Sequence, residues 1–216
     1  FMAQTAYADD IDFSKYTSTY GYDNLATFDD GDDRKAVYDG IYDAYEGLWS
    51  SAEDLTTEYV ADSGFYAIAQ LDVSAYNLDT SDLLEIYIAF QFDNPIFYYA
   101  PTSFYPPTEN SQTMTLVIDE DYIKASERTR LNALVMSTVS EYETAVAALT
   151  TDYDKMVAVH DKLLESMYYS YDDEGNPSDE VWAHNVIGSF DKGKGVCESY
   201  AKVYQLVMNA LGYESI

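Results

Sequence analysis

The sequence has very little cysteine and very little positive charge. A single cysteine, Cys197, occurs in 216 residues, which excludes an internal disulfide framework. Only 11 Lys and Arg residues stand against 39 Asp and Glu residues, so the formal net charge is −28. A chain this acidic repels phosphate backbones, which excludes nucleic acid as a partner, and it disfavours binding to anionic membrane surfaces. No apolar run approaches the roughly 18 residues that a membrane-spanning helix needs.

Aromatic residues, in contrast, are abundant. They make up 16% of the chain, and tyrosine alone accounts for 23 residues. Acidic disordered chains are poor in aromatic residues, so we expect a folded protein. With 216 residues and 47% apolar residues, the chain is long enough for one large domain or two small ones. Tyrosine can bury its ring and keep its hydroxyl in water, and we expect that arrangement here.

The chain begins with Phe rather than Met. The residues from Phe1 to Ala8 are of the kind found around a secretory cleavage site, although no basic segment or long apolar segment of a signal peptide is present. Together with the acidity and the scarce cysteine, this start favours an exported bacterial surface protein, extracellular or on the cell surface.

Hydrophobic spacing predicts a helix-rich α+β chain in two parts, an N-terminal α/β accessory domain over 1–150 and a second domain over 151–216. The elements expected in the first part are a helix over 34–49 capped by Asp32 or Asp33, a segment at 65–78 that fits either strand or helix, a helix over 82–92 capped by Thr80 or Ser81, a β-rich run at 96–99, a strand at 113–118 and a mostly helical stretch at 119–149.

The second part has a clearer pattern. Its expected elements are a helix to Tyr168 capped by Thr151 or Asp152, a loop at 172–177, a helix over 179–190 capped by Ser178, a glycine-rich turn at 191–195, a helix over 197–211 ended by Gly212, and the first residues of a strand at 213–216. The helix over 197–211 is apolar nearly all round, so we expect it to be buried centrally.

Cys197 lies at the predicted start of that helix, directly after Gly193-Lys194-Gly195-Val196. Free N–H groups and partial positive charge at a helix N-terminus stabilise a thiolate, and the N–H of Cys197 can help to hold an oxyanion. Small residues ahead of the thiol allow a substrate backbone to approach. The alternative is that Cys197 is a small buried apolar residue.

The segment Gly193-Lys194-Gly195-Val196-Cys197-Glu198-Ser199-Tyr200-Ala201, with its later Leu211-Gly212-Tyr213-Glu214, resembles the nucleophile segment of the bacterial transglutaminase-like, papain-like thiol superfamily. The upstream helix from Asp154 to Leu163, which contains His160-Asp161, is similar to a second element of that family. Asp93-Asn94-Pro95-Ile96-Phe97-Tyr98 resembles an element ahead of the core in surface-exported members. The resemblance covers about residues 150–216 well and 82–150 loosely.

The resemblance implies a thiol mechanism in which Cys197 attacks an amide or ester carbonyl, a His moves the proton and an Asp orients the His. In this family the His and Asp follow the Cys, and no match for them occurs in these residues. We therefore expect them beyond Ile216 and expect only the N-terminal part of the core here. The two histidines present, His160 on the apolar face of its helix and His184 partly exposed, do not match the family's base.

Other candidate sites are weaker. Residues that could line a site around Cys197 are His184, Trp182, Gly195 and Tyr200. The acidic loop from Asp172 to Pro177 resembles a calcium-binding loop. However, Pro177 occupies the position where an EF-hand needs Gly. The sequence holds no paired His and Cys set for zinc, so we expect neither a metal nor a cofactor.

The sequence therefore predicts a thiol acyl-transferase or peptidase that acts on protein or peptide amides, cell-wall peptide being one option, with Cys197 as the nucleophile. We expect the 216-residue chain by itself to be inactive. The alternative is a non-catalytic cell-surface module that keeps the fold and binds cell-wall peptide, glycan or a protein.

Overall fold

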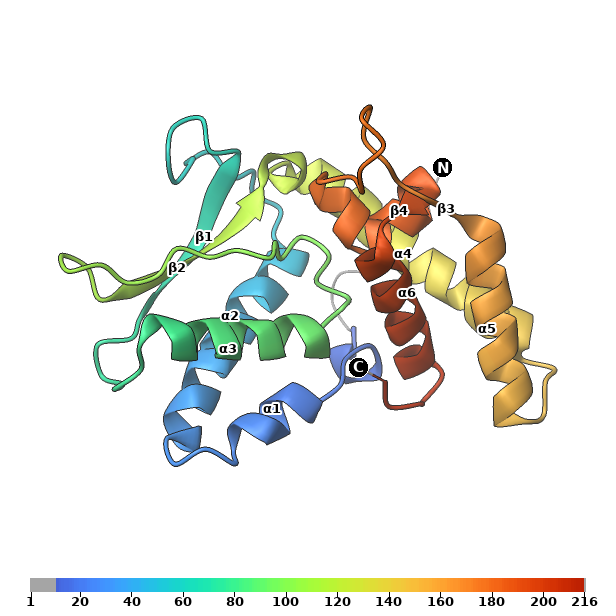
Figure 1. Cartoon of the computed structure of the whole chain (residues 1–216), viewed down its shortest axis with the longest axis horizontal. Coiled ribbons are helices and arrows are strands. Elements are labelled where there is room, and N and C mark those ends of the chain that lie inside the picture. The colour runs from blue at the N-terminus through green and yellow to red at the C-terminus, as the bar shows by residue number, and fades with distance from the viewer. Residues whose placement is uncertain (1–10, 216) are drawn as a thin grey trace. The chain divides into compact units, whose positions relative to one another are not determined.

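The computed structural model describes residues 11–215, and the predicted cleavage-site residues 1–8 lie outside them. The chain is α+β and rich in helix, as predicted (Figure 1). Its elements are η1 (Phe13–Lys15), α1 (Tyr20–Leu25), α2 (Gly31–Trp49), β1 (Phe65–Asp72), α3 (Thr80–Asp93), β2 (Thr113–Asp119), η2 (Glu120–Tyr122), α4 (Ala125–Val146), α5 (Asp152–Ser166), β3 (Tyr168–Tyr169), η3 (Val181–His184), the π-helical turn η4 (Gly188–Lys192), β4 (Lys194–Gly195) and α6 (Cys197–Ala210).

The described residues form two compact units, one made of residues 19–129 and the other of residues 11–18 and 130–215. The division falls inside α4, and the sequence-based boundary at residue 150 stays a prediction. Among the described residues, no helix has both the length and the apolar character needed to cross a bilayer.

The first unit packs α2 and α3 together and places α2 against β1, which pairs antiparallel with β2 (Figure 1). The ambiguous segment at 65–78 is therefore a strand to Asp72, and the strand predicted at 113–118 is confirmed. The β-rich run at 96–99 is wrong as a strand, because these four residues form buried turns directly after α3.

Tyrosines fill much of the core of this unit, and their hydroxyls are not in water as the composition suggested. Tyr45, Tyr87 and Tyr99 are each 0% exposed. The Tyr45 hydroxyl donates to the Val117 carbonyl at 2.9 Å, and the Tyr87 hydroxyl donates to the Pro101 carbonyl at 2.8 Å. Burial raises the pKa of all three phenols. Because buried hydroxyls are costly without a partner, these bonds fix how each ring sits.

Asp93, the first residue of the Asp-Asn-Pro segment noted in the sequence, has a buried carboxylate with a structural role. Asp93 ends α3 and is 0% exposed. Its two oxygens accept from the backbone N–H groups of Gly21 and Tyr22, each at 2.8 Å, and one also accepts from the Tyr38 hydroxyl at 3.0 Å. N–H groups in the first turn of a helix stabilise an anion, so Asp93 fixes the start of α1 against the end of α3.

Two helix starts differ from the prediction. The cap of α3 is Asp79, one residue before Thr80, and it forms a capping box with Asp82. The residue before α2 is Asp30, whereas Asp32 and Asp33 lie in the first turn. Asp30 makes no side-chain cap bond, because its carboxylate accepts from the Arg34 Nε at 2.6 Å instead.

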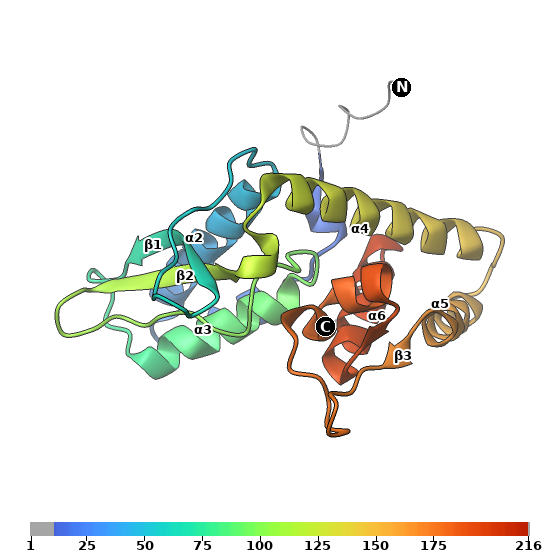
Figure 2. The same ribbon diagram turned by 90° about the horizontal axis from the view of Figure 1, so that it is seen from above.

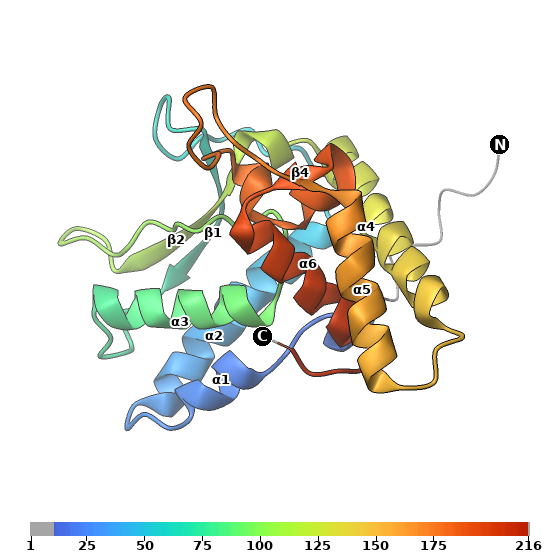
Figure 3. The same cartoon turned by 45° about the vertical axis from the view of Figure 1, so that its right-hand side comes forward.

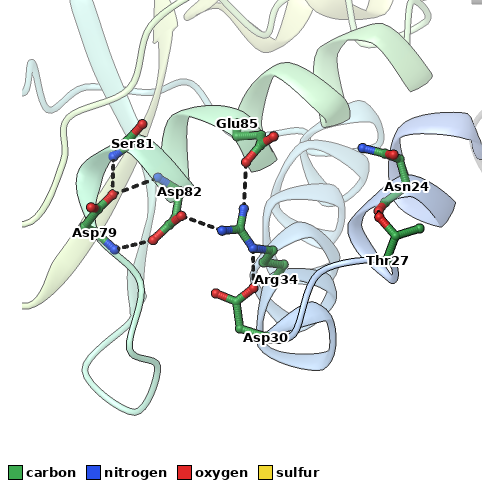
Figure 4. Close-up of polar contacts among 8 residues, drawn as sticks. All are labelled: Asn24, Thr27, Asp30, Arg34, Asp79, Ser81, Asp82 and Glu85. Carbon is green, nitrogen blue, oxygen red and sulfur yellow. Dashed lines mark hydrogen bonds and ion pairs between the residues drawn. The ribbon is translucent and has the colours of Figure 1, made fainter.

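Arg34 is the centre of a charged cluster that joins α2 to α3 (Figure 4). Its side chain is only 6% exposed, and it pairs with Asp30, with Asp82 and, at 2.9 Å, with Glu85. The guanidinium also lies over the Phe28 ring, 4.3 Å from the ring centre. Three carboxylates compensate one desolvated cation, which is the condition under which a buried charge is tolerated.

Acid should weaken this cluster. The backbone N–H of Asp79 and then the Arg34 guanidinium hold the pKa of Asp82 below its usual range, against an opposing effect of burial. A carboxyl with a lowered folded-state pKa stabilises the fold above its unfolded pKa of about 4, and this stabilisation is lost as pH falls through the folded value. We expect Asp82→Asn to cost about 1–2 kcal/mol at pH 7 and progressively less below pH 4. Urea unfolding of both proteins from pH 7 to 3 measures the difference.

The comparison with Asp82→Asn is necessary because acid also relieves the repulsion of a −28 chain, which changes the stability of both proteins. A constant difference in unfolding free energy between the two proteins across this range would contradict the ionic role of Asp82.

In the second unit, α4 buries one stripe of side chains and α5 packs on α6 (Figure 2). The stripe of α4 follows the predicted helical spacing and consists of Leu131, Val135, Val139, Tyr142 and Val146. Lys15, the last residue of η1, pairs with Glu143 at 2.6 Å, which attaches the segment 11–18 to α4. The predicted cap Thr151 is confirmed at the start of α5, where its hydroxyl accepts from the N–H of Asp154.

The helix predicted over 179–190 is wrong as one continuous element. Asn185 interrupts it in an extended conformation, so that η3 ends before this residue and η4 follows. The Asn185 amide donates to the Val181 carbonyl at 3.0 Å, and its side-chain oxygen accepts from the N–H of Ile187 at 2.8 Å. Asn side chains compete in this way with the backbone bonds of a helix.

The strand predicted at 213–216 is absent from 213–215, and Ile216 lies outside the described residues. Gly212, at φ +85°, ends α6 as predicted, and the N–H of Tyr213 bonds back to the Met208 carbonyl at 3.0 Å. The N–H of Ser215 then donates to the Asn209 side chain at 2.9 Å. These bonds fold the chain back onto the end of α6.

Candidate functional site

Cys197 is the first residue of α6 and is exposed to solvent. The rest of the helix is less uniform than predicted. Ala201, one turn further on, is also exposed, whereas most residues from Val203 to Ala210 are buried. The expectation of a helix buried on all sides is therefore wrong for its first turns. An exposed thiol followed by a small side chain leaves the start of the helix open to a reactant.

The start of α6 is uncapped, unlike the starts of α3 and α5. Its N-cap is Val196, which makes no side-chain cap bond and has no polar side-chain atom that could accept one. Val196 is 2% exposed, and its own N–H donates to the Ala183 carbonyl at 2.9 Å. A valine in place of Ser, Thr or Asp at an N-cap costs roughly 1 kcal/mol. The N–H of Ser199 donates to the Val196 carbonyl at 3.0 Å, and the N–H groups of Cys197 and Glu198 are left for solvent or a bound anion.

The turn ahead of Cys197 is held by a short parallel pairing of β3 with β4 (Figure 3). Gly193 adopts φ +63°, a left-handed conformation that glycine reaches without strain. The N–H of Tyr168 donates to the Gly193 carbonyl, and the N–H of Ser170 donates to the Gly195 carbonyl, both at 3.0 Å. The two residues before Val196 therefore have a fixed backbone path.

Gly195 and Gly188 allow three segments to meet around Ser199. A Cβ at Gly195 would lie 2.6 Å from both the Cβ and the Oγ of Ser199, and a Cβ at Gly188 would lie 2.7 Å from the Lys194 carbonyl oxygen. The Ser199 hydroxyl donates to the Asn185 carbonyl at 2.7 Å. Ser199 is 0% exposed, so this bond anchors the first turn of α6 from beneath.

His184, a predicted site-lining residue, makes two hydrogen bonds. Its Nε2 lies 3.0 Å from the Ser178 carbonyl, and its Nδ1 lies 3.1 Å from the Glu198 carboxylate. A carbonyl and a carboxylate can only accept, so both bonds form only when both ring nitrogens carry a proton. Both ring nitrogens are therefore engaged by groups other than Cys197. His184 instead links η3 to the first turn of α6.

His160 lies on an exposed face of α5, so its predicted place on the apolar stripe is wrong. Its side chain is 58% exposed, and its Nδ1 lies 3.0 Å from the neighbouring Asp161 carboxylate. The buried residues of α5 are Val159 and Leu163, and Met167 directly after the helix is also buried. Val159 takes the buried position that was expected for His160, which lies in water.

The other predicted site-lining residues lie near the ends of the same short elements. Trp182 is half-buried in η3, and Lys194 lies over its ring, 5.2 Å from the ring centre. Tyr200 lies three residues after Cys197 in α6, and its hydroxyl donates to the Met167 carbonyl at 3.4 Å. Gly195 is buried two residues before the thiol.

Sequence reasoning did not identify Ser199, Glu198 or the tyrosines of β3 as parts of this site. Glu198 accepts from Lys202 at 2.6 Å as well as from His184, and its place in the first helical turn suits a negative charge. The helical spacing of Glu198 and Lys202 could have predicted that pair. The parallel pairing of β3 with β4 has no such local signal.

Among residues 11–215, no group of three or more His, Cys, Asp or Glu side chains is arranged to hold a metal ion. The start of α6 combines an exposed thiol with the N–H groups of Cys197 and Glu198, which make no hydrogen bond within the described residues.

No curated protein matches the chain. Residues 141–215 match the family model of the transglutaminase-like superfamily, a range that begins in the last turns of α4 and includes the whole of α6. The fold of this range is in general that of thiol acyl-transferases and peptidases. This C-terminal segment, with Cys197 at the start of its last helix, is therefore similar to the transglutaminase-like superfamily, and the match is consistent with a partial core of that kind.

Proposed function

We propose that Cys197 is the nucleophile of a thiol acyl-transferase or peptidase that acts on protein or peptide amides. The observation that carries the proposal is the position of the only thiol in the chain. It is exposed at the first residue of a helix whose N-cap has no side chain able to occupy the free N–H groups. An apolar N-cap lowers stability, and it leaves the N–H donors that an oxyanion needs.

The chemistry follows from these groups. The thiolate attacks the carbonyl carbon, and the carbonyl electron pair moves onto oxygen, where the N–H groups of Cys197 and Glu198 stabilise it. Collapse of this intermediate breaks the C–N bond, and the amine leaves with a proton from the general acid. The remaining thioester is then opened by water in a hydrolase or by a second amine in a transferase.

We propose that the general base and its orienting acid lie outside these 216 residues. The sequence has two histidines. His160 is exposed on α5 and beside Asp161, and His184 engages both ring nitrogens. A thiol without a proton acceptor is a weak catalyst, so the 216-residue chain alone should not turn over a substrate.

The proposed substrate is a protein or peptide, with cell-wall peptide as one option, and the proposed location is the bacterial cell surface or the medium. The net charge of −28 keeps the chain soluble and supports an exposed, solvated setting. The second candidate is a non-catalytic binding module that keeps the fold, and the engagement of His184 favours it.

Alkylation of Cys197 distinguishes the two. We expect iodoacetamide to modify Cys197 of the 216-residue chain only slightly faster than an unstructured thiol at pH 6–7. The protein as encoded, with any residues after Ile216, should react at least about tenfold faster at pH 6, because a neighbouring imidazolium favours the thiolate. Intact-mass measurement of alkylation against pH gives both rates.

The urea-unfolded chain serves as the reference for an unstructured thiol, and Cys197→Ala shows that no other group is modified. Identical rate profiles for the encoded protein and the 216-residue chain would contradict the catalytic assignment and favour the binding module.

A further inference from the structure

Three tyrosines form an aromatic platform beside the start of α6. Tyr171 is 60% exposed and Tyr169 is 37% exposed. The rings of Tyr169 and Tyr171 lie 5.0 Å apart, and Tyr169 stacks on half-buried Tyr200 at 6.5 Å with 19° between the ring planes. Exposed aromatic groups of this size indicate an interaction surface.

The platform is next to the thiol through two independent connections. Tyr169 is the β3 residue paired with Gly195, two positions before Cys197, and Gly195 has no side chain. Tyr200 is three residues after Cys197, and residues at this spacing share one side of a helix. Cys197 therefore lies in the chain between Gly195, which pairs with Tyr169, and Tyr200.

The backbone beneath the platform is fixed. The N–H groups of Tyr168 and Ser170 donate to the carbonyls of Gly193 and Gly195, and Tyr171 forms a bridge with Pro177. Rings carried on a fixed backbone lose little conformational freedom when they bind a ligand, since tyrosine has only two side-chain torsions.

The charge beside the platform has one sign. The segment 168–180 contains five acidic residues and no Lys or Arg, and all five acids are exposed, namely Asp172, Asp173, Glu174, Asp179 and Glu180. The nearby lysines of the same unit have other contacts. Lys192 pairs with Asp191 and Lys202 pairs with Glu198, while Lys194 lies over Trp182. A cation is attracted to the faces of the exposed rings by the cation–π interaction and to the neighbouring carboxylates by their negative charge.

We infer that this platform, Tyr169, Tyr171 and Tyr200 with the acidic segment 172–180, is a subsite for a Lys- or Arg-bearing segment of the peptide substrate, next to the residue that reacts with Cys197. The occupant follows from charge complementarity, because a cationic side chain satisfies both the ring faces and the carboxylates. The role of the subsite in presenting a substrate to Cys197 rests on the proposed function. Binding of a cationic peptide to the platform does not.

The test uses the 216-residue chain and two fluorescent eight-residue peptides. Each peptide has a central glutamine, flanked in one by two arginines on each side and in the other by citrulline, which keeps the shape and removes the charge. We expect the arginine peptide to bind about five- to tenfold more tightly in fluorescence anisotropy at low salt. We expect this preference to shrink as salt is added.

A matched pair of variants locates the binding. The double variant Tyr169→Ala/Tyr171→Ala should lose the preference for arginine, whereas Tyr169→Phe, which keeps the ring, should retain it. Tyr153→Ala is the control, because Tyr153 is 75% exposed but lies at the far end of α5, about 20 Å along the helix from Ser166. The removed side chains are exposed, so melting temperatures should be unchanged.

Equal affinity for the arginine and citrulline peptides would overturn the inference. The same conclusion follows if Tyr153→Ala weakens binding as much as the double variant does. Neither result affects the alkylation of Cys197, so failure of this inference and failure of the proposed function are distinguishable.

Discussion

Replacing Cys197 with alanine is expected to reduce acyl transfer or hydrolysis by the encoded protein at least about 10³-fold. The reason is that no other thiol exists in these residues to form the thioester. Stability should change by less than about 0.5 kcal/mol, because the side chain is exposed and the helix start does not depend on it. Initial rates of amine release and thermal unfolding of both proteins measure the two effects.

The matched control is Ala201→Ser, on the same exposed face one turn later. It adds one small polar atom without touching the thiol, so we expect its activity to stay within a few-fold of the parent. A Cys197→Ala protein that retains most of the activity would contradict the nucleophilic role.

The largest expected effect on stability comes from Gly195 and Gly188. We expect Gly195→Ala to cost about 2–3 kcal/mol, because the new methyl group would lie 2.6 Å from the Ser199 Cβ, an atom fixed in the helix. Gly188→Ala should cost at least as much, since the atoms in its way are the backbone carbonyl oxygens of Lys194 and Trp182 at 2.7 and 2.8 Å. Urea unfolding gives both values.

Gly47→Ala is the control for these two variants. Gly47 also lies in a helix, and a Cβ there would meet nothing within 4 Å. We expect this substitution to be neutral or to stabilise by up to about 1 kcal/mol, as alanine does in an exposed helix position. Combining Ser199→Gly with Gly195→Ala removes the clashing atoms and should recover part of the loss. If Gly195→Ala behaved like Gly47→Ala, the packing beneath the thiol would be looser than described.

Local signals in the sequence were enough to place the nucleophile segment. The start of α6 after a glycine-rich turn, its end at Gly212 and the Thr151 cap of α5 each depend on a few neighbouring residues. The stripe of α4 follows from a single helical repeat. Such features are predictable because the physical cause lies within one or two turns of the residue concerned.

The features that were missed depend on contacts between distant segments. Nothing near Tyr169 indicates that it pairs with Gly195, 26 residues later, so the aromatic platform could not be found from spacing. His160 was misplaced because both it and the buried Val159 fit helical spacing with Leu163. The break at Asn185 arises from side-chain bonds that compete with the helix, and composition does not show which one prevails.

The tyrosines show the same limit in the core. Their number indicated folding, but only the three-dimensional packing brings the Tyr45 hydroxyl to the Val117 carbonyl and the Tyr99 hydroxyl to the Tyr45 carbonyl. These bonds allow phenol groups to be buried completely. A count of tyrosines does not separate such core residues from the exposed rings of Tyr168 and Tyr171.

The most direct test of the nucleophilic role of Cys197 is the mass of the encoded protein quenched in acid during turnover of a glutamine-containing peptide. The proposed mechanism predicts a fraction of protein heavier by one acyl group, with the added mass on the peptide that contains Cys197 and removed by hydroxylamine, as a thioester requires. The Cys197→Ala protein should show no such species. Turnover with the added mass on another residue, or turnover that continues in Cys197→Ala, would contradict it.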